Sequence, residues 1–164
     1  MVHLRVGHWY TGGAVVAAAL LTAGCQSAPG PAAPSAVPTA GPVTRLVDRQ
    51  VDAPTAFSSA SGNVGCLLDA RMARCDISER NWAPPLRPAD CELAYGQGVT
   101  LRVGRPAEFV CAGDTALGPE ATLDPGHTIT AGGLRCESAG SAIACRELET
   151  GHGFSLSPDA YHLF

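Results

Sequence analysis

Six cysteines in the second part of the chain constrain its fold more than any other feature. Eight residues separate Cys66 from Cys75, and eight also separate Cys136 from Cys145. Counting outward from a two-residue turn at Gly140-Ser141 places Cys136 opposite Cys145, in a non-hydrogen-bonded pair of an antiparallel hairpin. The Cα atoms of such a pair are about 4.5 Å apart, a separation that a disulfide tolerates. We therefore expect a disulfide across this hairpin.

The same count predicts the other two bridges. With Ala70-Arg71 at the tip of a hairpin, Cys66 lies opposite Cys75, which leaves Cys91 and Cys111 to bond each other. Six cysteines allow many pairings, and hairpin geometry favours 66–75, 91–111 and 136–145. Zinc sites use cysteines spaced C-x₂₋₄-C, and no two cysteines here are that close. The repeated spacing also hints at an old duplication, although the two halves share little else.

Hydrophobic periodicity indicates strands, with almost no helical signal. Short segments bounded by Gly, Pro, Asn and Asp recur at residues 64–68, 72–77, 99–103, 107–111, 134–137, 143–146 and 153–157. We expect an all-β domain, a small antiparallel sandwich or open barrel of hairpins held by about three disulfides. We interpret five aromatic residues as core or loop anchors, not as a platform for ligand stacking: Phe57, Trp82, Tyr95, Phe109 and Phe154.

The start of the chain resembles a bacterial lipoprotein signal. It has a mildly cationic beginning, an apolar stretch over residues 14–21, and the sequence Leu21-Thr22-Ala23-Gly24-Cys25. The apolar stretch is shorter than the ~20 residues of a membrane-spanning helix. Thr22 stands where such signals more often have leucine. We expect residues 1–24 to be a signal peptide and Cys25 to carry a lipid; simple secretion and an uncleaved anchor are the alternatives.

Residues 25–54 are expected to be the lipidated cysteine followed by a linker rich in proline and alanine. Residues 26–44 contain five prolines and no charge, a composition typical of a stiff, extended spacer. The folded domain is expected over residues 55–164, enough for one core. The predicted location is the extracytoplasmic face of the cell membrane, where disulfides persist.

Charge and composition exclude several classes of function. The net charge is −4, and all 11 basic residues are arginine, with no lysine in the chain. A domain without a basic patch is a poor partner for nucleic acid. The absence of lysine excludes a P-loop, a Schiff-base lysine and an S-x-x-K nucleophile. No cofactor is expected.

Three residues are candidates for a catalytic or metal site. Asp114 lies in the turn-like segment C-A-G-D-T, His127 follows Asp124-Pro125-Gly126, and His152 stands between two glycines. Each has an ordinary interpretation as a turn residue. If the three loops converged, the side chains would resemble an acid/base pair or a metal site. No G-x-S-x-G or H-E-x-x-H motif supports catalysis, and paired cysteines leave no thiol nucleophile.

A set of motifs carries a resemblance to a known family. These are S-G-N-x-x-C at residues 61–66, C-A-G-D-T at 111–115 and G-H-G-F at 151–154, together with Trp82 and the remaining cysteines. The combination resembles a family of secreted and lipid-anchored actinobacterial proteins of unknown function, over about residues 57–164. The resemblance implies an exported cell-envelope protein. It implies no substrate and no functional residues.

The leading hypothesis is a non-catalytic binding or structural module displayed outside the membrane through Cys25, with an unknown envelope or extracellular ligand. One alternative is a secreted hydrolase or metal-binding domain that uses Asp114 with His127 or His152. Another is a small protease inhibitor that presents a cystine-braced loop, for which residues 112–126 are the candidate.

Overall fold

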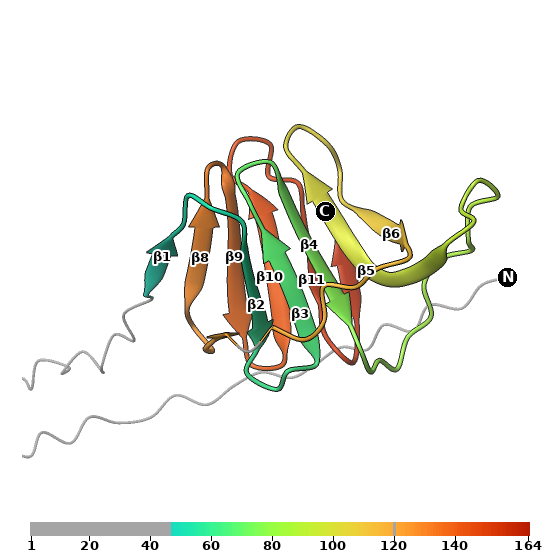
Figure 1. Ribbon diagram of the computed structural model, residues 1–164, viewed down its shortest axis with the longest axis horizontal. Coiled ribbons are helices and arrows are strands. Elements are labelled where there is room, and N and C mark those ends of the chain that lie inside the picture. The colour runs from blue at the N-terminus through green and yellow to red at the C-terminus, as the bar shows by residue number, and fades with distance from the viewer. Residues whose placement is uncertain (1–46, 120) are drawn as a thin grey trace, which may run out of the picture. The chain divides into compact units, whose positions relative to one another are not determined.

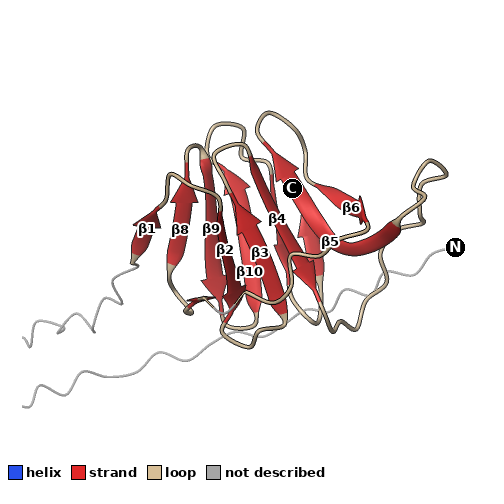
Figure 2. Cartoon of the chain, viewed as in Figure 1, coloured by secondary structure: helices blue, strands red, loops and turns tan. Residues whose placement is uncertain are grey.

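The computed structural model describes residues 47–119 and 121–164, which form twelve β-strands and no helix (Figure 2). The signal peptide, Cys25 and most of the expected linker lie outside the described residues. The strands are β1 (Asp48–Gln50), β2 (Thr55–Ser59), β3 (Val64–Leu68), β4 (Met72–Ile77), β5 (Ala94–Arg102), β6 (Glu108–Ala112), β7 (Thr122–Leu123), β8 (Thr128–Ala131), β9 (Leu134–Ala139), β10 (Ala142–Glu147), β11 (Gly153–Leu156) and β12 (Tyr161–Leu163). Within these ranges there is no helix long and apolar enough to cross a bilayer.

The strands form two six-stranded sheets that pack on each other (Figure 1). Sheet I has the order β6-β5-β4-β3-β2-β7, and sheet II has the order β1-β8-β9-β10-β11-β12. Their inner faces share one core, in which Phe57 and Leu101 of sheet I and Ile143 and Phe154 of sheet II are fully buried. The expectation of an all-β sandwich is confirmed. Two edge pairs, β1 with β8 and β2 with β7, are parallel. The short strands β1 and β7 belong to no hairpin and join the edges of the sheets separately.

The three predicted disulfides are present. Cys66 is opposite Cys75 with a Cα–Cα distance of 4.1 Å, and Cys136 is opposite Cys145 at 4.0 Å. The turn of the second hairpin is at the predicted place, and Gly140 has the positive φ (63°) that a two-residue turn favours. The third bridge joins residues 91 and 111 across 5.9 Å between their Cα atoms. Three disulfides indicate a protein that folds outside the cytoplasm.

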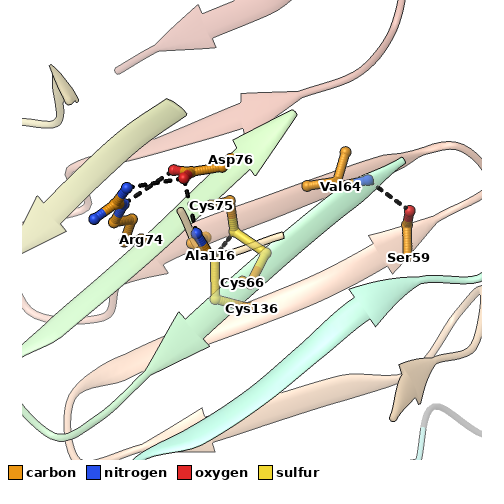
Figure 3. Close-up of a disulfide and its surroundings, with 9 residues drawn as sticks. Ser59, Val64, Cys66, Arg74, Cys75, Asp76, Ala116 and Cys136 are labelled. Atoms are coloured by element: carbon orange, nitrogen blue, oxygen red, sulfur yellow. Dashed lines mark hydrogen bonds and ion pairs between the residues drawn. A yellow bond between two sulfur atoms is a disulfide. The ribbon is translucent and has the colours of Figure 1, made fainter. Parts of the chain in front are cut away.

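The two hairpin disulfides meet in the middle of the core. The Sγ atoms of Cys75 and Cys145 are 3.9 Å apart, and all four cysteines of these bridges are at most 1% exposed. Figure 3 shows the bridge between Cys66 and Cys75 with Cys136 of the other sheet beside it. Each sheet therefore contributes one bridge to a layer of sulfur between the sheets.

The two sheets repeat one topology. Strands β2 to β6 follow one another across sheet I, and β8 to β12 do the same across sheet II. Each series is preceded by a short strand that pairs in parallel with the first strand of the other series: β1 with β8, and β7 with β2. The sandwich thus consists of two equivalent halves, β1–β6 and β7–β12, which exchange their first strands. This arrangement supports the duplication suggested by the cysteine spacing.

Strand β1 extends the fold to the N-terminal side of residue 55, where we expected the domain to begin. The carboxylate of Asp48 accepts hydrogen bonds from the hydroxyls of Thr128 (2.9 Å) and Thr130 (3.0 Å), and the backbone N–H of Val51 donates to the carbonyl of Thr130 (2.9 Å). The hydrogen bond from Thr128 is the main reason that the pKa of Asp48 is lowered. Residues 48–51 therefore belong to the folded unit.

Candidate functional site

The three site residues predicted from the sequence lie in three different connections. Asp114 follows β6, and its carboxylate, 80% exposed, accepts a hydrogen bond from Nη1 of Arg74 at 2.8 Å. His127 lies between β7 and β8, and His152 lies between β10 and β11. Both histidines take part in turns through their backbones: the N–H of His127 donates to the carbonyl of Asp124, and the carbonyl of His152 accepts from Glu147. In the described part of the chain, no group of three or more His, Cys, Asp or Glu side chains could hold a metal ion.

A groove on the outer face of sheet I is the better-formed site. It has a volume of about 360 Å³ and lies over β4, β5 and β6, with the connection between β4 and β5 forming one wall. The strand register explains its floor, because Arg74, Thr100 and Glu108 are opposite one another on three adjacent strands and point to the same face. The lining residues are Met72, Arg74, Pro88, Asp90, Cys91, Tyr95, Thr100, Arg102, Glu108, Phe109, Val110, Cys111 and Ala112.

A second hollow of about 270 Å³ has four lining residues in common with the groove, Arg74, Tyr95, Val110 and Ala112. Its lining also includes Asp114. Of the three residues predicted from the sequence, Asp114 thus lies beside the groove, whereas His127 and His152 line neither hollow.

Arg74 organises one end of the groove. Its guanidinium donates to both carboxylate oxygens of Asp76, from Nε at 3.0 Å and from Nη2 at 2.8 Å, and also to the carboxylate and the carbonyl of Asp114. The hydrogen bond to Asp76 is the main cause of the raised pKa of Arg74. The hydrogen bond from Arg74 in turn lowers the pKa of Asp114. Arg74 therefore remains charged, and four of its five N–H donors bond to the protein.

Asp76 fixes the segment after β6 against the sheet. It is 1% exposed, and Oδ2 accepts a hydrogen bond from the backbone N–H of Ala116 at 2.9 Å (Figure 3). Gly98 on the neighbouring strand makes room for this carboxylate, because a Cβ at position 98 would overlap Oδ1 of Asp76 and lie 2.5 Å from the carbonyl oxygen of Cys75. The carboxylate that is buried here thus has a structural role, and it acts on the groove only through Arg74.

Thr100 supplies a hydrogen-bonding group that the protein does not use. The residue is 5% exposed, and within the residues that the structure describes its Oγ1 has no hydrogen-bond partner. Buried polar atoms are almost always paired, and each exception calls for an explanation. Thr100 lines the groove, but its hydroxyl oxygen is covered in the free protein. A rotation of the side chain about χ1 would turn the hydroxyl toward a bound ligand.

Sequence patterns place two residues of this region on the outer face of a strand but do not mark them as a site. Arg74 and Asp76 alternate with Cys75, so the strand pattern places both on the face opposite the core. Thr100 alternates with Val99 and Leu101 in the same way. That it lies beside Arg74 and Glu108 depends on the register of three strands and on a β-bulge between Tyr95 and Val99, which the sequence does not show. Phe57 and Phe154, two of the five aromatic residues expected to be core or loop anchors, are fully buried in the core.

The remaining predicted aromatic residues, Trp82, Tyr95 and Phe109, are half-buried at one edge of the sandwich together with Tyr161. The rings of Trp82 and Tyr161 are 4.8 Å apart between centroids, and those of Phe109 and Tyr161 are 4.9 Å apart. These contacts join β6, β12 and the connection after β4. The cluster closes the open edge of the core, consistent with aromatic anchors.

Comparison with known proteins places the chain in a family without giving it a function. Neither a curated protein nor a solved structure matches it. Residues 48–164 match the family of unknown function DUF6636, and the match begins at the first residue of β1. The chain therefore belongs to the DUF6636 family.

Proposed function

We propose that this protein is a non-catalytic binding module of the cell envelope, held at the outer face of the membrane by a lipid on Cys25, and that the groove over β4–β6 binds a polar ligand. The observation that carries the proposal is the unpaired, buried hydroxyl of Thr100 in the lining of that groove. A hydroxyl without a partner destabilises the free protein, and a ligand that bonds to it recovers the lost hydrogen bond.

The groove favours a ligand rich in hydroxyl or amide groups over one with a large charge. Its ionic side chains are balanced, because Arg102 donates to Glu108 at 2.6 Å and Arg74 is held by two aspartates. The ring of Tyr95 adds an aromatic surface to the lining of both hollows. An aromatic surface beside scattered hydrogen-bonding groups fits a saccharide, so we propose an envelope oligosaccharide as the ligand.

The proposed anchor depends on the sequence around Cys25. A thioether-linked lipid adds about 0.8 kcal/mol of membrane affinity per buried methylene, and several acyl chains together give a stable attachment. We expect Cys25→Ser to move the protein from the membrane fraction to the soluble fraction of the cells that express it. Retention of that variant in the membrane fraction would contradict the proposed lipid anchor.

Ligand binding in the groove is tested with a variant that removes only the hydroxyl of Thr100. Thr100→Val keeps the shape of the side chain and removes the hydroxyl. In titrations of the whole chain with oligosaccharides released from purified cell walls, we expect Thr100→Val to weaken binding by roughly tenfold, the equivalent of one hydrogen bond of about 1.4 kcal/mol. The same variant should unfold at an equal or higher urea concentration, because it no longer buries an unpaired polar atom.

Ser138→Ala is the matched control. Ser138 is fully buried in sheet II, and its Oγ is likewise without a partner in the described residues. This variant should raise the midpoint of unfolding and leave the oligosaccharide titration unchanged. Equal binding by wild type and Thr100→Val would refute the groove as the binding site.

A further inference from the structure

The two halves of the sandwich differ most in one connection. Residues 78–93 join β4 to β5, whereas residues 148–152 make the equivalent connection from β10 to β11. The longer connection projects from the sheets before β5 (Figure 1) and contains Ala83-Pro84-Pro85-Leu86-Arg87-Pro88, a stretch without turn or bend. Leu86 is 96% exposed, the highest exposure among the large hydrophobic side chains of the described residues. The fold does not need this segment, since the other half lacks it.

The N-terminal side of the segment is fixed to both sheets. The indole Nε1 of Trp82 donates to the carbonyl of Ser157 at 2.8 Å. Pro84 packs so closely on Gly96, which has a φ of +79°, that a Cβ at position 96 would lie 2.6 Å from the proline ring. Proline also fixes its own φ and keeps the preceding residue extended. Residues 82–85 are therefore held in an extended form before any partner binds.

The C-terminal side is fixed independently. Nε of Arg87 donates to the carbonyl of Cys91 at 2.7 Å, and Nη2 donates to the carbonyl of Leu93 at 2.5 Å. The disulfide from Cys91 to Cys111 then joins the segment to β6. Leu86 thus lies between two separately anchored pieces of backbone, with its side chain in solvent.

We propose that residues 83–88 are the reactive loop of a serine-peptidase inhibitor, with Leu86 entering an apolar specificity pocket. A preorganised, extended and exposed segment enters a cleft with little further loss of conformational entropy. The loop is not the one expected from the sequence. Within residues 112–126, Asp76 holds Ala116 against sheet I, and Ala121 accepts a hydrogen bond from the backbone of Ser58.

The reacting bond is the peptide bond from Leu86 to Arg87. The next bond, from Arg87 to Pro88, is a tertiary amide and a poor substrate for these peptidases. The peptidase serine Oγ would bond to the carbonyl carbon of Leu86, the bond to the nitrogen of Arg87 would break, and the serine proton would pass through the peptidase histidine to that nitrogen.

The contacts of the Arg87 side chain decide what happens to the acyl ester. In an ordinary substrate the new amine leaves, and water hydrolyses the ester. Here the side chain of Arg87 is held by two carbonyls, so the amine stays beside the ester and can attack it. That attack re-forms the peptide bond and returns the proton to the peptidase serine. Reversal is favoured because the amine is held at a high effective concentration.

The proposal is tested with the whole chain purified in detergent and with chymotrypsin and subtilisin, which accept leucine before the cleaved bond. We expect tight inhibition of the hydrolysis of a chromogenic Ala-Ala-Pro-Leu substrate, and no inhibition of trypsin. Leu86→Gly should weaken inhibition by roughly a hundredfold, as for loss of a buried anchor residue. Leu86→Arg should transfer inhibition to trypsin. Val103→Ala, which shortens another exposed apolar side chain, should inhibit like wild type.

Removal of the disulfide that supports the Arg87 contacts gives an independent readout. Without the bridge to β6, the double variant Cys91→Ser/Cys111→Ser should become a substrate: inhibition fades with time, and mass spectrometry shows cleavage after Leu86. Failure of the wild-type chain to inhibit either peptidase would overturn the proposal, and so would rapid cleavage of wild type after Leu86. A failure to inhibit leaves the groove proposal standing, because Thr100, which tests oligosaccharide binding, lies on β5 outside the loop.

Discussion

Loop length alone predicts that the bridge from Cys91 to Cys111 is the most stabilising of the three. In the chain-entropy treatment, a sequence separation of 9 corresponds to about 2.6 kcal/mol, and a separation of 20 corresponds to about 3.3 kcal/mol. On that basis Cys91→Ala/Cys111→Ala should destabilise the protein more than Cys66→Ala/Cys75→Ala.

Packing reverses this order. Cys66 and Cys75 are at most 1% exposed, and their bridge contacts the bridge of the other sheet. Truncation of each buried cysteine to alanine leaves a void of about one sulfur atom, and a void of methyl size costs about 1 kcal/mol. The loss at 66–75 therefore reaches about 4.5 kcal/mol. Cys111 is exposed, and Cys91, although 7% exposed, lies outside the shared core in the lining of the groove. Water can therefore fill the space left by truncation, and the loss at 91–111 stays near the entropic value.

The assay is urea unfolding of each double variant under oxidising conditions, followed by tryptophan fluorescence. Free energies should be extrapolated to water, because removal of a cross-link also changes the slope against urea. Cys136→Ala/Cys145→Ala is the matched control and should resemble the variant at 66–75, since its cysteines are equally buried. A larger loss at 91–111 than at 66–75 would refute the argument that stacked sulfur packing outweighs loop length.

Three further predictions concern carboxylates and glycines. Asp48 has a lowered pKa in the folded protein, so its contribution is present above pH ~4 and is lost as the pH falls through the folded pKa. The protection of the β1 amides from exchange, measured against the intrinsic exchange rate at each pH, should fall from pH ~5 to ~2, and Asp48→Asn should remove that loss of protection. Asp76→Ala should cost about 3–5 kcal/mol in urea unfolding, because it leaves a partly buried guanidinium without its main partner, whereas the exposed control Asp114→Ala should unfold near the wild-type midpoint. Gly98→Ala should abolish accumulation of folded protein, because the Cβ of the new alanine would overlap the Asp76 carboxylate. Gly104→Ala is the control: position 104 has open space but a φ of +74°, so this variant should lower stability by about 1 kcal/mol. Similar yields of both variants would contradict the predicted overlap.

The cysteines made much of the fold predictable. The spacing of Cys136 and Cys145 sets both the turn and the register of one hairpin, and register is the property of a sheet that sequence patterns usually leave open. Strand β1 was not predictable in this way. It has three residues, all exposed, and it is held by threonine hydroxyls of β8, which lies far along the chain.

The candidate site was less predictable for a related reason. The unpaired hydroxyl of Thr100 is visible only when the neighbours across β4 and β6 are known, and nothing in its local sequence distinguishes it from other strand threonines. The predicted loop at residues 112–126 contains Asp114, but the buried carboxylate of Asp76 draws that segment onto the sheet. Long-range hydrogen bonds decide which loop is free, and single-sequence patterns do not contain them.

The internal repeat separates what the fold requires from what has been added to it. Both halves have a buried hairpin disulfide and an exchanged first strand, so these features suffice for the sandwich. The half formed by β1–β6 has in addition the long connection after β4, the bridge to β6 and the groove that this connection walls. Since the equivalent half folds without them, the additions are not explained by stability of the sandwich. This is why we place both proposed activities in one half, the binding of an oligosaccharide at Thr100 and the docking of a peptidase at Leu86.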